Sequence, residues 1–312
     1  MSSPHRVLVT GGAGFIGANL CRRLVSSDKI GQVRVIDDLS SGCLGNLDGL
    51  PVDILEGSIL DEAALASAAT DCDSIVHLAA VPSVPRSIRD PLRSHEANAT
   101  GTLRVLEAAR AAGGVHVMLA SSSSVYGSNP ALPKTEELQC RPMSPYAVSK
   151  LAAEQYAVAY AQCYGLPILP FRFFNVYGPL QAAGHAYAAV IPAFLDAALR
   201  DRSLPVYGDG LQTRDFTFVG TVTRVLHDAV LRRVTSGPVN LAFGTQTNLL
   251  EVVALLSRAL KRQVPVEHLH ARPGDVRHSQ ADNGLLRRLF PGVEPVPLDQ
   301  GLDETLRWFR EP

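Results

Sequence analysis

The sequence predicts an α/β protein with one doubly wound parallel sheet and a smaller α/β lobe toward its carboxyl end. Short β-branched runs alternate with helical patterns from residue 6 to about residue 178, as in strands joined by crossover helices. A glycine-rich turn joins the first strand to the first helix. Beyond Pro179 this alternation ends, so we divide the chain into a nucleotide-binding domain of residues 1–178, with returns near 215–244, and a lobe of residues 179–214 and 245–312.

The first strand and helix enclose the glycine-rich turn. A β-branched run over residues 6–10 leads into Gly11, Gly14 and Gly17, and a helical pattern covers residues 18–25. Glycines at these positions allow a tight turn, bring backbone N–H groups close to a pyrophosphate and seat the helix against the sheet. This pattern predicts a Rossmann-type dinucleotide site. The alternative is an ordinary crossover in which the glycines serve only packing.

An acidic residue follows the second predicted strand at the spacing that a nucleotide ribose requires. The strand over residues 33–36 ends at Asp37, 20 residues beyond Gly17. A carboxylate at this place binds the adenosine ribose hydroxyls and repels a 2′-phosphate, and no arginine follows it directly. The predicted cofactor is therefore NAD rather than NADP, and we expect Arg34 to face away from the site.

The other elements follow from the same patterns. β-Branched or apolar runs predict strands, and small-residue or amphipathic patterns predict helices. The predicted strands are 52–55, 74–80, 115–120, 168–174 and 239–242, and the predicted helices are 62–69, 98–112, 146–164, 187–200, 222–233, 249–260 and 300–310. We expect a parallel sheet of six or seven strands and an amphipathic helix over residues 146–164.

Two polar residues of these elements allow a structural or a functional interpretation. His77 lies in an apolar strand, where a hydrogen-bonded structural histidine is more common than a catalytic one. Asn98 opens the helix over residues 98–112, where an asparagine can serve simply as an N-cap.

Hydroxyl groups gather where the strand over residues 115–120 ends. Four serines, residues 121–124, follow it directly. In open α/β sheets ligands bind beyond the carboxyl ends of the strands, so a serine here can hydrogen-bond a substrate hydroxyl or relay its proton. The alternative is a polar exit from strand to loop.

Tyr146 and Lys150 stand four residues apart at the start of a helical pattern, which places both side chains on one helix face. A phenol has an unperturbed pKa of about 10, and an ammonium group within a few ångströms lowers that pKa. The pair is a candidate acid/base device, although the same spacing also occurs on solvated helix faces.

Two polar clusters beyond Pro179 combine arginines with glycines. They cover residues 207–216 and 272–279. Such clusters suit a second diphosphate, and surface-loop charge is the alternative.

Composition excludes several classes of protein. The 29 basic and 30 acidic residues nearly cancel and alternate along the chain, so we expect no nucleic-acid or membrane partner. Five cysteines without CxxC spacing predict neither a disulfide framework nor a metal site. No apolar stretch has the length of a membrane span, and no charged segment followed by an apolar run opens the chain, which predicts a cytoplasmic location.

Taken together, the motifs resemble the extended short-chain dehydrogenase/reductase family, and most closely its nucleotide-sugar 4-epimerases. The similarity extends from about residue 5 to residue 309, with the motifs in the same order. The motifs that carry it are Thr10–Gly17, His77–Ala80, Ser121–Gly127, Tyr146–Lys150, Arg172–Pro179 and Arg214–Phe216.

The resemblance implies a role for each matching residue. Tyr146 is the base that takes the proton of the sugar 4-hydroxyl, Lys150 lowers the pKa of that phenol and holds the nicotinamide ribose, and Ser122 is the catalytic serine. The implied NAD-binding residues are Gly11, Gly14, Phe15, Ile16, Gly17, Asp37, Asp38, Ser40, Ser41, Gly42, Ser58, Ile59, Leu78, Ala79, Ala80, Asn98, Tyr146 and Lys150. The implied substrate-binding residues are Ser83, Ser122, Ser123, Tyr146, Asn175, Arg214, Arg272, Asp275 and Ser279.

The implied reaction is epimerisation at C4 of a UDP-hexose through a bound 4-keto sugar, by a homodimer that keeps NAD bound. Alternatives are a UDP-uronic acid 4-epimerase, a 4,6-dehydratase, a decarboxylase or a non-catalytic NAD-binding protein. Dehydratases of the family carry carboxylates where this chain has Ser123 and Ser124, and the decarboxylases tend to carry a glutamate at the Ser124 position, so the serines favour epimerisation.

Two positions bear on substrate and cofactor affinity. Ser279, seven residues beyond Arg272, is small where a tyrosine restricts related epimerases to plain hexoses, so we expect UDP-N-acetylhexosamines to be accepted beside UDP-glucose and UDP-galactose. Ser58 replaces the aspartate that the family usually has at the adenine edge, which predicts weaker NAD binding.

Overall fold

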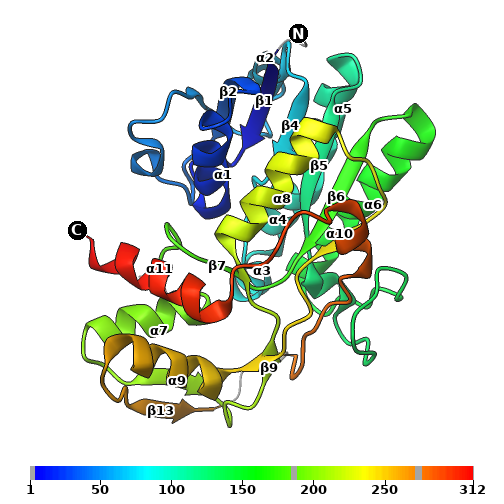
Figure 1. Ribbon diagram of the computed structural model, residues 1–312. Coiled ribbons are helices and arrows are strands. Elements are labelled where there is room, and N and C mark those ends of the chain that lie inside the picture. Colours follow the sequence, from blue (N-terminus) through cyan, green and yellow to red (C-terminus); the bar gives the residue numbers. More distant parts are fainter. Residues whose placement is uncertain (1–3, 184–187, 271–275, 312) are drawn as a thin grey trace.

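The protein contains a seven-stranded parallel sheet with helices on both faces and a smaller lobe below its carboxyl edge (Figure 1). The computed structural model describes residues 4–183, 188–270 and 276–311. The strand order is β11-β6-β5-β4-β1-β2-β3, and each neighbouring pair is parallel. This result confirms the predicted fold class and the upper of the two predicted strand numbers.

The sheet strands are β1 (His5–Thr10), β2 (Ile30–Asp37), β3 (Asp53–Glu56), β4 (Ser74–His77), β5 (His116–Ser122), β6 (Ile168–Phe173) and β11 (Val239–Leu241). Around them lie α1 (Phe15–Val25), α2 (Glu62–Ala69), α3 (Val84–Arg89), α4 (Pro91–His95), α5 (Gly101–Ala111), α6 (Pro145–Tyr164), α8 (Val219–Arg232), α10 (Gly284–Leu289) and the short helical segments η1 (Leu44–Leu47), η2 (Glu96–Thr100) and η3 (Ser123–Tyr126).

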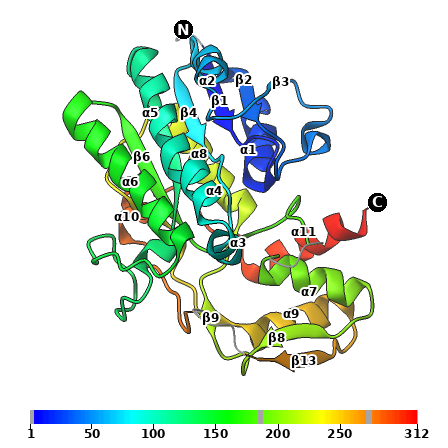
Figure 2. The same cartoon turned by 180° about the vertical axis from the view of Figure 1, so that it is seen from behind.

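Two apolar layers hold the helices to the sheet. On the face turned toward the viewer in Figure 1, side chains of α1, α8 and α10 pack on the strands. On the opposite face, seen in Figure 2, side chains of α2, α5 and α6 do so. Because both faces are covered, the strands are apolar runs rather than alternating ones.

The smaller lobe has its own apolar core, formed with the helices α7 (Val190–Leu199), α9 (Leu249–Leu260) and α11 (Leu298–Arg310). Strands β8 (Leu204–Tyr207) and β13 (Val266–Leu269) pair in parallel. Four two-residue strands form two further pairs, β7 (Val176–Tyr177) with β10 (Thr217–Phe218) and β9 (Thr213–Arg214) with β12 (Thr247–Asn248).

The structure differs from the predicted elements in three places. Asn98 does not open a helix, because a helical path already runs through α4 and η2 before it reaches α5. Helix α6 is not amphipathic: its two charged residues, Lys150 and Glu154, are both buried, and its outer face is uncharged. Helix α10, placed by prediction in the smaller lobe, packs Leu286 into the core of the sheet.

No helix within the described ranges is long and apolar enough to cross a bilayer. Among the same residues, no cluster of three or more His, Cys, Asp or Glu side chains is arranged to hold a metal ion.

Candidate active site

The sheet order reverses between β1 and β4, and the predicted site residues follow these strands and β5. β2 and β3 extend from β1 to one side, and β5, β6 and β11 extend from β4 to the other. Open α/β sheets bind ligands at such a switch point, beyond the carboxyl ends of the strands. Gly11 follows β1, Leu78–Ala80 follow β4 and Ser122 ends β5.

The glycine turn after β1 is tightly packed. Gly11 has a φ of +70°, and a Cβ atom on it would lie 2.7 Å from the backbone of Ala79. A Cβ atom on Gly17 would lie 2.2 Å from the carbonyl oxygen of Gly11. Gly14 is the N-cap of α1 and offers no side-chain cap. The first-turn amides of α1, which include those of Phe15 and Ile16, are therefore available to an anion such as a pyrophosphate.

Asp37 ties this turn to the end of β2. Its Oδ2 accepts a 2.9 Å hydrogen bond from the Ala13 N–H, and its Oδ1 accepts one of 2.9 Å from the Leu39 N–H. Burial raises the pKa of the Asp37 carboxyl, and these two hydrogen bonds oppose the rise. Each carboxylate oxygen keeps acceptor capacity for a ribose hydroxyl. A Cβ atom on Gly42 would lie 3.0 Å from Asp37 Oδ1, so Gly42 lies against the carboxylate.

The other predicted cofactor residues have different surroundings. Asp38, Ser40 and Ser41 are exposed in the loop after β2. Ser58 follows β3, and its hydroxyl accepts a 3.1 Å hydrogen bond from the Leu60 N–H, while Ile59 is buried. Arg34 donates to the carbonyl oxygen of Ala68 at 2.6 Å, away from the turn, as predicted.

Asn98 joins the segment after β4 to α6. Its Oδ1 accepts from the Val81 N–H at 2.8 Å, and its Nδ2 donates to Val81 O at 3.2 Å and to Ser149 Oγ at 3.0 Å. The N-cap interpretation was wrong, because these contacts are tertiary. Asn98 positions the backbone around Val81 relative to α6.

Ser144 and Pro145 determine where helix α6 starts. The Ser144 hydroxyl caps it by accepting a 3.1 Å hydrogen bond from the Ala147 N–H, and Pro145 occupies the first turn. Tyr146 therefore lies at the helix start and hydrogen-bonds Ser122 at the end of β5. Lys150, one turn later, donates a 2.9 Å hydrogen bond to the carbonyl oxygen of Ala120. The structure thus brings the three predicted catalytic residues together.

Burial and a hydrogen bond act in opposite directions on the phenol of this group. Burial raises the pKa of Tyr146, and the hydrogen bond from Ser122 lowers it. Burial also lowers the pKa of Lys150 to about 8. The Ser122 hydroxyl therefore favours the phenolate form of Tyr146.

His77 has a structural role, as predicted. Its Nδ1 lies 2.7 Å from Thr10 Oγ1 and its Nε2 lies 2.9 Å from Thr102 Oγ1, and burial lowers its pKa to about 3. The neutral ring links β1, β4 and α5.

The described residues among those predicted to hold the sugar nucleotide come from several elements. Asn175 has a φ of +24° and donates a 3.3 Å hydrogen bond to Asp215 O. Arg214 lies on β9, and Ser279 adjoins this strand because the Ser279 N–H donates to Thr213 O at 3.2 Å. Ser83 caps α3 with a strained φ of +99°. Arg272 and Asp275 fall outside the described residues, as does most of the segment between β13 and Val276.

Sequence reasoning missed three buried charged residues that support these loops and helices. Asp215 accepts hydrogen bonds from Gly244 N, Thr245 Oγ1 and Ala281 N at 3.0–3.1 Å, and so joins three loops around Arg214. Glu154 and Arg172 pair behind Ser121. A signal for Glu154 existed, because it and Lys150 are the only charged residues in the 20 residues of α6.

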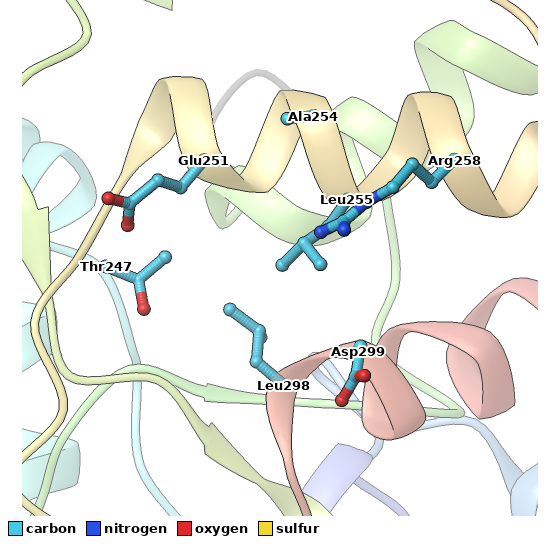
Figure 3. A pocket seen from close by; sticks show the side chains of 7 residues that line it. All are labelled: Thr247, Glu251, Ala254, Leu255, Arg258, Leu298 and Asp299. Carbon is cyan, nitrogen blue, oxygen red and sulfur yellow. The ribbon is translucent and has the colours of Figure 1, made fainter.

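A pocket of about 340 Å³ lies elsewhere, between α9 and α11 of the smaller lobe (Figure 3). The side chains of Leu255 and Leu298 face each other across it, and Glu251, Arg258 and Asp299 lie around them. Among the residues that the structure describes, none of those predicted to bind cofactor or substrate borders this pocket.

Comparison with known proteins identifies the family. Residues 7–242 match the model of the NAD dependent epimerase/dehydratase family. The chain is 37% identical over 317 residues to a UDP-glucose 4-epimerase of Mycolicibacterium smegmatis, with 98% of each chain covered.

Solved structures agree with this assignment. A UDP-N-acetylglucosamine 4-epimerase from Methanobrevibacter ruminantium, in complex with UDP-N-acetylmuramic acid, is 35% identical with a TM-score of 0.92 and 99% of both chains covered. A UDP-glucose 4-epimerase from Thermotoga maritima, with UDP-glucose, is 32% identical with a TM-score of 0.92, covering 98% of this chain and 99% of that one.

Relatives with other reactions also match. They include a UDP-N-acetyl-α-D-glucosaminuronate decarboxylase of Bacillus cytotoxicus, 32% identical with 98% of each chain covered. A dTDP-glucose 4,6-dehydratase from Streptomyces venezuelae, solved with NAD, is 33% identical with a TM-score of 0.89, covering 98% of this chain and 97% of that one. The glycine turn and the Asp37 carboxylate fit NAD, and the chain belongs to the NAD-dependent epimerase/dehydratase family, with NAD as its cofactor.

Proposed function

We propose that the chain catalyses epimerisation at C4 of UDP-hexoses through a 4-keto sugar. The observation that supports this most is the arrangement of Tyr146, Ser122 and Lys150 at the end of β5, with hydroxyls alone at the two positions that follow Ser122. The relatives from M. smegmatis and M. ruminantium are UDP-sugar 4-epimerases, which adds support.

Tyr146 performs the proton chemistry. As the phenolate, it takes the proton of the 4-hydroxyl while that O–H bond breaks and the C4 carbonyl forms. NAD supplies the redox chemistry, because it takes up the C4 hydrogen with two electrons and later gives it back. Tyr146 then returns the proton to the oxygen. Return of the hydrogen to the opposite face of C4 inverts the configuration, and no external oxidant is consumed.

Elimination and decarboxylation are less well supported by the residues near Ser122. Ser124 donates a 2.9 Å hydrogen bond to Ser122 Oγ at a position where dehydratases and decarboxylases of the family have a carboxylate. The carboxylate on the catalytic helix, Glu154, is fully buried and held by Ser121 and Arg172. It is not free to act as an acid or base on a sugar.

The loops below the sheet are proposed to bind the UDP portion and set the choice of sugar. We assign Asn175, Arg214 and Arg272 to the diphosphate, and Ser83, Ser123, Asp275 and Ser279 to the remainder of the substrate. Ser279 adjoins β9 through its backbone, so its small side chain lies near the arginine of that strand. This placement supports acceptance of an N-acetyl group beside plain hexoses.

We also propose that the enzyme is a homodimer formed through α6 and the neighbouring helices. The outer face of α6 carries no charge and exposes Val148 and Tyr156, and α4 beside it exposes Leu92 to 78%. A 20-residue helix whose outer face carries no charge and exposes several large apolar side chains is stabilised when a second layer covers that face.

The division into an NAD-binding part, residues 1–178 with returns near 215–244, and a sugar-binding lobe remains part of this proposal, with α10 now assigned to the sheet.

A panel of UDP-sugars tests the reaction. Purified chain with NAD is incubated separately with UDP-glucose, UDP-galactose and their N-acetylamino counterparts, and products are resolved by chromatography. We expect interconversion within each gluco and galacto pair, abolished in Tyr146→Phe. Products limited to uronic or deoxy sugars, or no product, contradict the proposal.

A further inference from the structure

Ser124, which has no role in the proposed mechanism so far, contacts Ser122 twice. Its hydroxyl lies 2.9 Å from Ser122 Oγ, and its backbone N–H donates to the same oxygen at 3.2 Å. Ser122 in turn hydrogen-bonds the Tyr146 phenol. The hydroxyls of Ser124, Ser122 and Tyr146 therefore form a row of hydrogen-bonded groups from η3 to the start of α6.

The direction of the hydrogen bonds among these hydroxyls follows from counting their protons. Tyr146 can act as a base only as the phenolate, and a phenolate oxygen can only accept hydrogen bonds. Ser122 must then give its single proton to Tyr146. The contact between the two serine hydroxyls must consequently run from Ser124 to Ser122.

In this state Ser122 Oγ is saturated. It accepts from the N–H and the O–H of Ser124, which occupy both of its lone pairs, and it donates its only proton to Tyr146. A sugar hydroxyl that passed its proton through Ser122 would need a free lone pair on that oxygen. None is left.

We propose that Ser124 is a positioning residue that commits Ser122 to donating toward Tyr146, so that the sugar proton passes to the phenolate directly and not through Ser122. The O–H bond of the sugar breaks, the O–H bond of Tyr146 forms, and Ser122 keeps its own proton throughout. The identity of the sugar rests on the proposed function, and the direction of the hydrogen bonds does not.

Three other buried titratable groups on the surrounding elements have partners outside this set of hydroxyls. Lys150 lies on the same helix, turned to Ala120 O, with a pKa of about 8. His77 is neutral, with a pKa of about 3, and Glu154 is paired with Arg172 behind Ser121. Substitutions at Ser122 and Ser124 leave all three in place.

Ser122→Ala separates the two proton routes in the NAD-loaded enzyme. With direct transfer, loss of the donor raises the pKa of Tyr146, so the fold-loss in kcat is greatest at low pH and shrinks steadily as pH rises. With a relay through Ser122, the transfer path is missing as well, so a loss in kcat remains at pH values where Tyr146 is fully ionised. A loss that persists on this alkaline plateau overturns the proposal.

Ser124→Ala tests the positioning role. We expect the acid limb of the pH profile of kcat to move up by about 0.5–1 pH unit, because Ser122 loses one of its hydrogen bonds. Below that limb, turnover should be about 3–10-fold slower, with little change in KM. Ser124→Thr keeps the hydroxyl and should restore the wild-type limb. Ser128→Ala is the matched control, since Ser128 is exposed just beyond the same turn. An unmoved limb in Ser124→Ala contradicts the proposal.

A spectroscopic titration makes the result independent of the reaction. The near-ultraviolet absorbance of phenolate is followed with pH in the NAD-loaded enzyme, and the curve of Tyr146→Phe is subtracted. The Tyr146 midpoint should rise in Ser124→Ala and return in Ser124→Thr. If no UDP-sugar reacts but this shift is seen, the proposed function fails and the hydrogen-bond direction stands; if the midpoint does not move, the inference fails.

Discussion

Arg172 on β6 and Glu154 on α6 form a bidentate ion pair. Arg172 Nε lies 3.0 Å from Glu154 Oε2, and Arg172 Nη2 lies 2.7 Å from Oε1. Ser121 donates a 2.6 Å hydrogen bond to the same carboxylate, and Arg172 donates to the Tyr126 hydroxyl at 2.9 Å. The side chain of Arg172 is 4% exposed and that of Glu154 is 0% exposed. Through these contacts the pair joins β6 to α6 and to β5, and so holds together the elements that carry Ser122 and Tyr146.

Glu154→Gln should destabilise the protein by about 3–5 kcal/mol, because it leaves the buried guanidinium without its countercharge. The free energy of unfolding is measured by urea denaturation. Asp228→Asn serves as the control, since it breaks the exposed pair with Arg232 and should cost less than about 1 kcal/mol. Equal losses in the two variants would show that burial of the pair is unimportant.

Stability should fall in acid because of His77. Its pKa is about 3 in the folded protein and about 6.5 when unfolded, so between these values the unfolded chain binds more protons. The contribution is present above about pH 6.5 and is lost as pH falls toward about 3, by at most about 1.4 kcal/mol per pH unit.

Urea denaturation between pH 7 and 4 measures this slope, and His77→Gln, which cannot titrate, is the comparison. The variant should be less stable at pH 7 and should lose less stability on acidification. Parallel curves for the two proteins would rule His77 out as the source.

Ser279→Tyr should exclude N-acetylated substrates. A tyrosine next to the β9 arginine fills the space proposed for the acetyl group, so kcat/KM for UDP-N-acetylglucosamine should fall at least about 10-fold more than kcat/KM for UDP-glucose. Ser279→Ala is the size-matched control and should keep the wild-type ratio. Similar losses on both substrates in the tyrosine variant would remove Ser279 from the choice of sugar.

Tyr156→Glu should dissociate the proposed dimer, because it places a charge on the uncharged outer face of α6. Sedimentation or light scattering gives the mass in solution. Leu250→Glu, at another exposed apolar residue on α9, is the control and should leave the mass unchanged. A dimer that survives Tyr156→Glu, or a monomeric wild-type protein, contradicts this interface.

Much of the fold could be predicted because its signals are local. β-Branched runs, the glycine turn and the helix start at Ser144-Pro145 each act over a few residues, and the corresponding elements were found close to their predicted bounds. The outer face of α6 was misjudged because apolar residues on both sides of a helix remove the periodic signal. The site of α10 depends on a distant contact with the sheet, which local patterns do not encode.

For the site, the sequence by itself determined the residue types and their order: glycines at a strand end, Asp37 after the next strand, serines after another, and Tyr146 four residues before Lys150. Tertiary structure decided how they act on one another. Only folding aims Lys150 at Ala120 O, makes Ser122 the group that lowers the pKa of Tyr146, and sets Ser124 behind it. Spacing along the chain fixes which residues share a face, whereas hydrogen-bond partners and desolvation depend on the elements that pack around them.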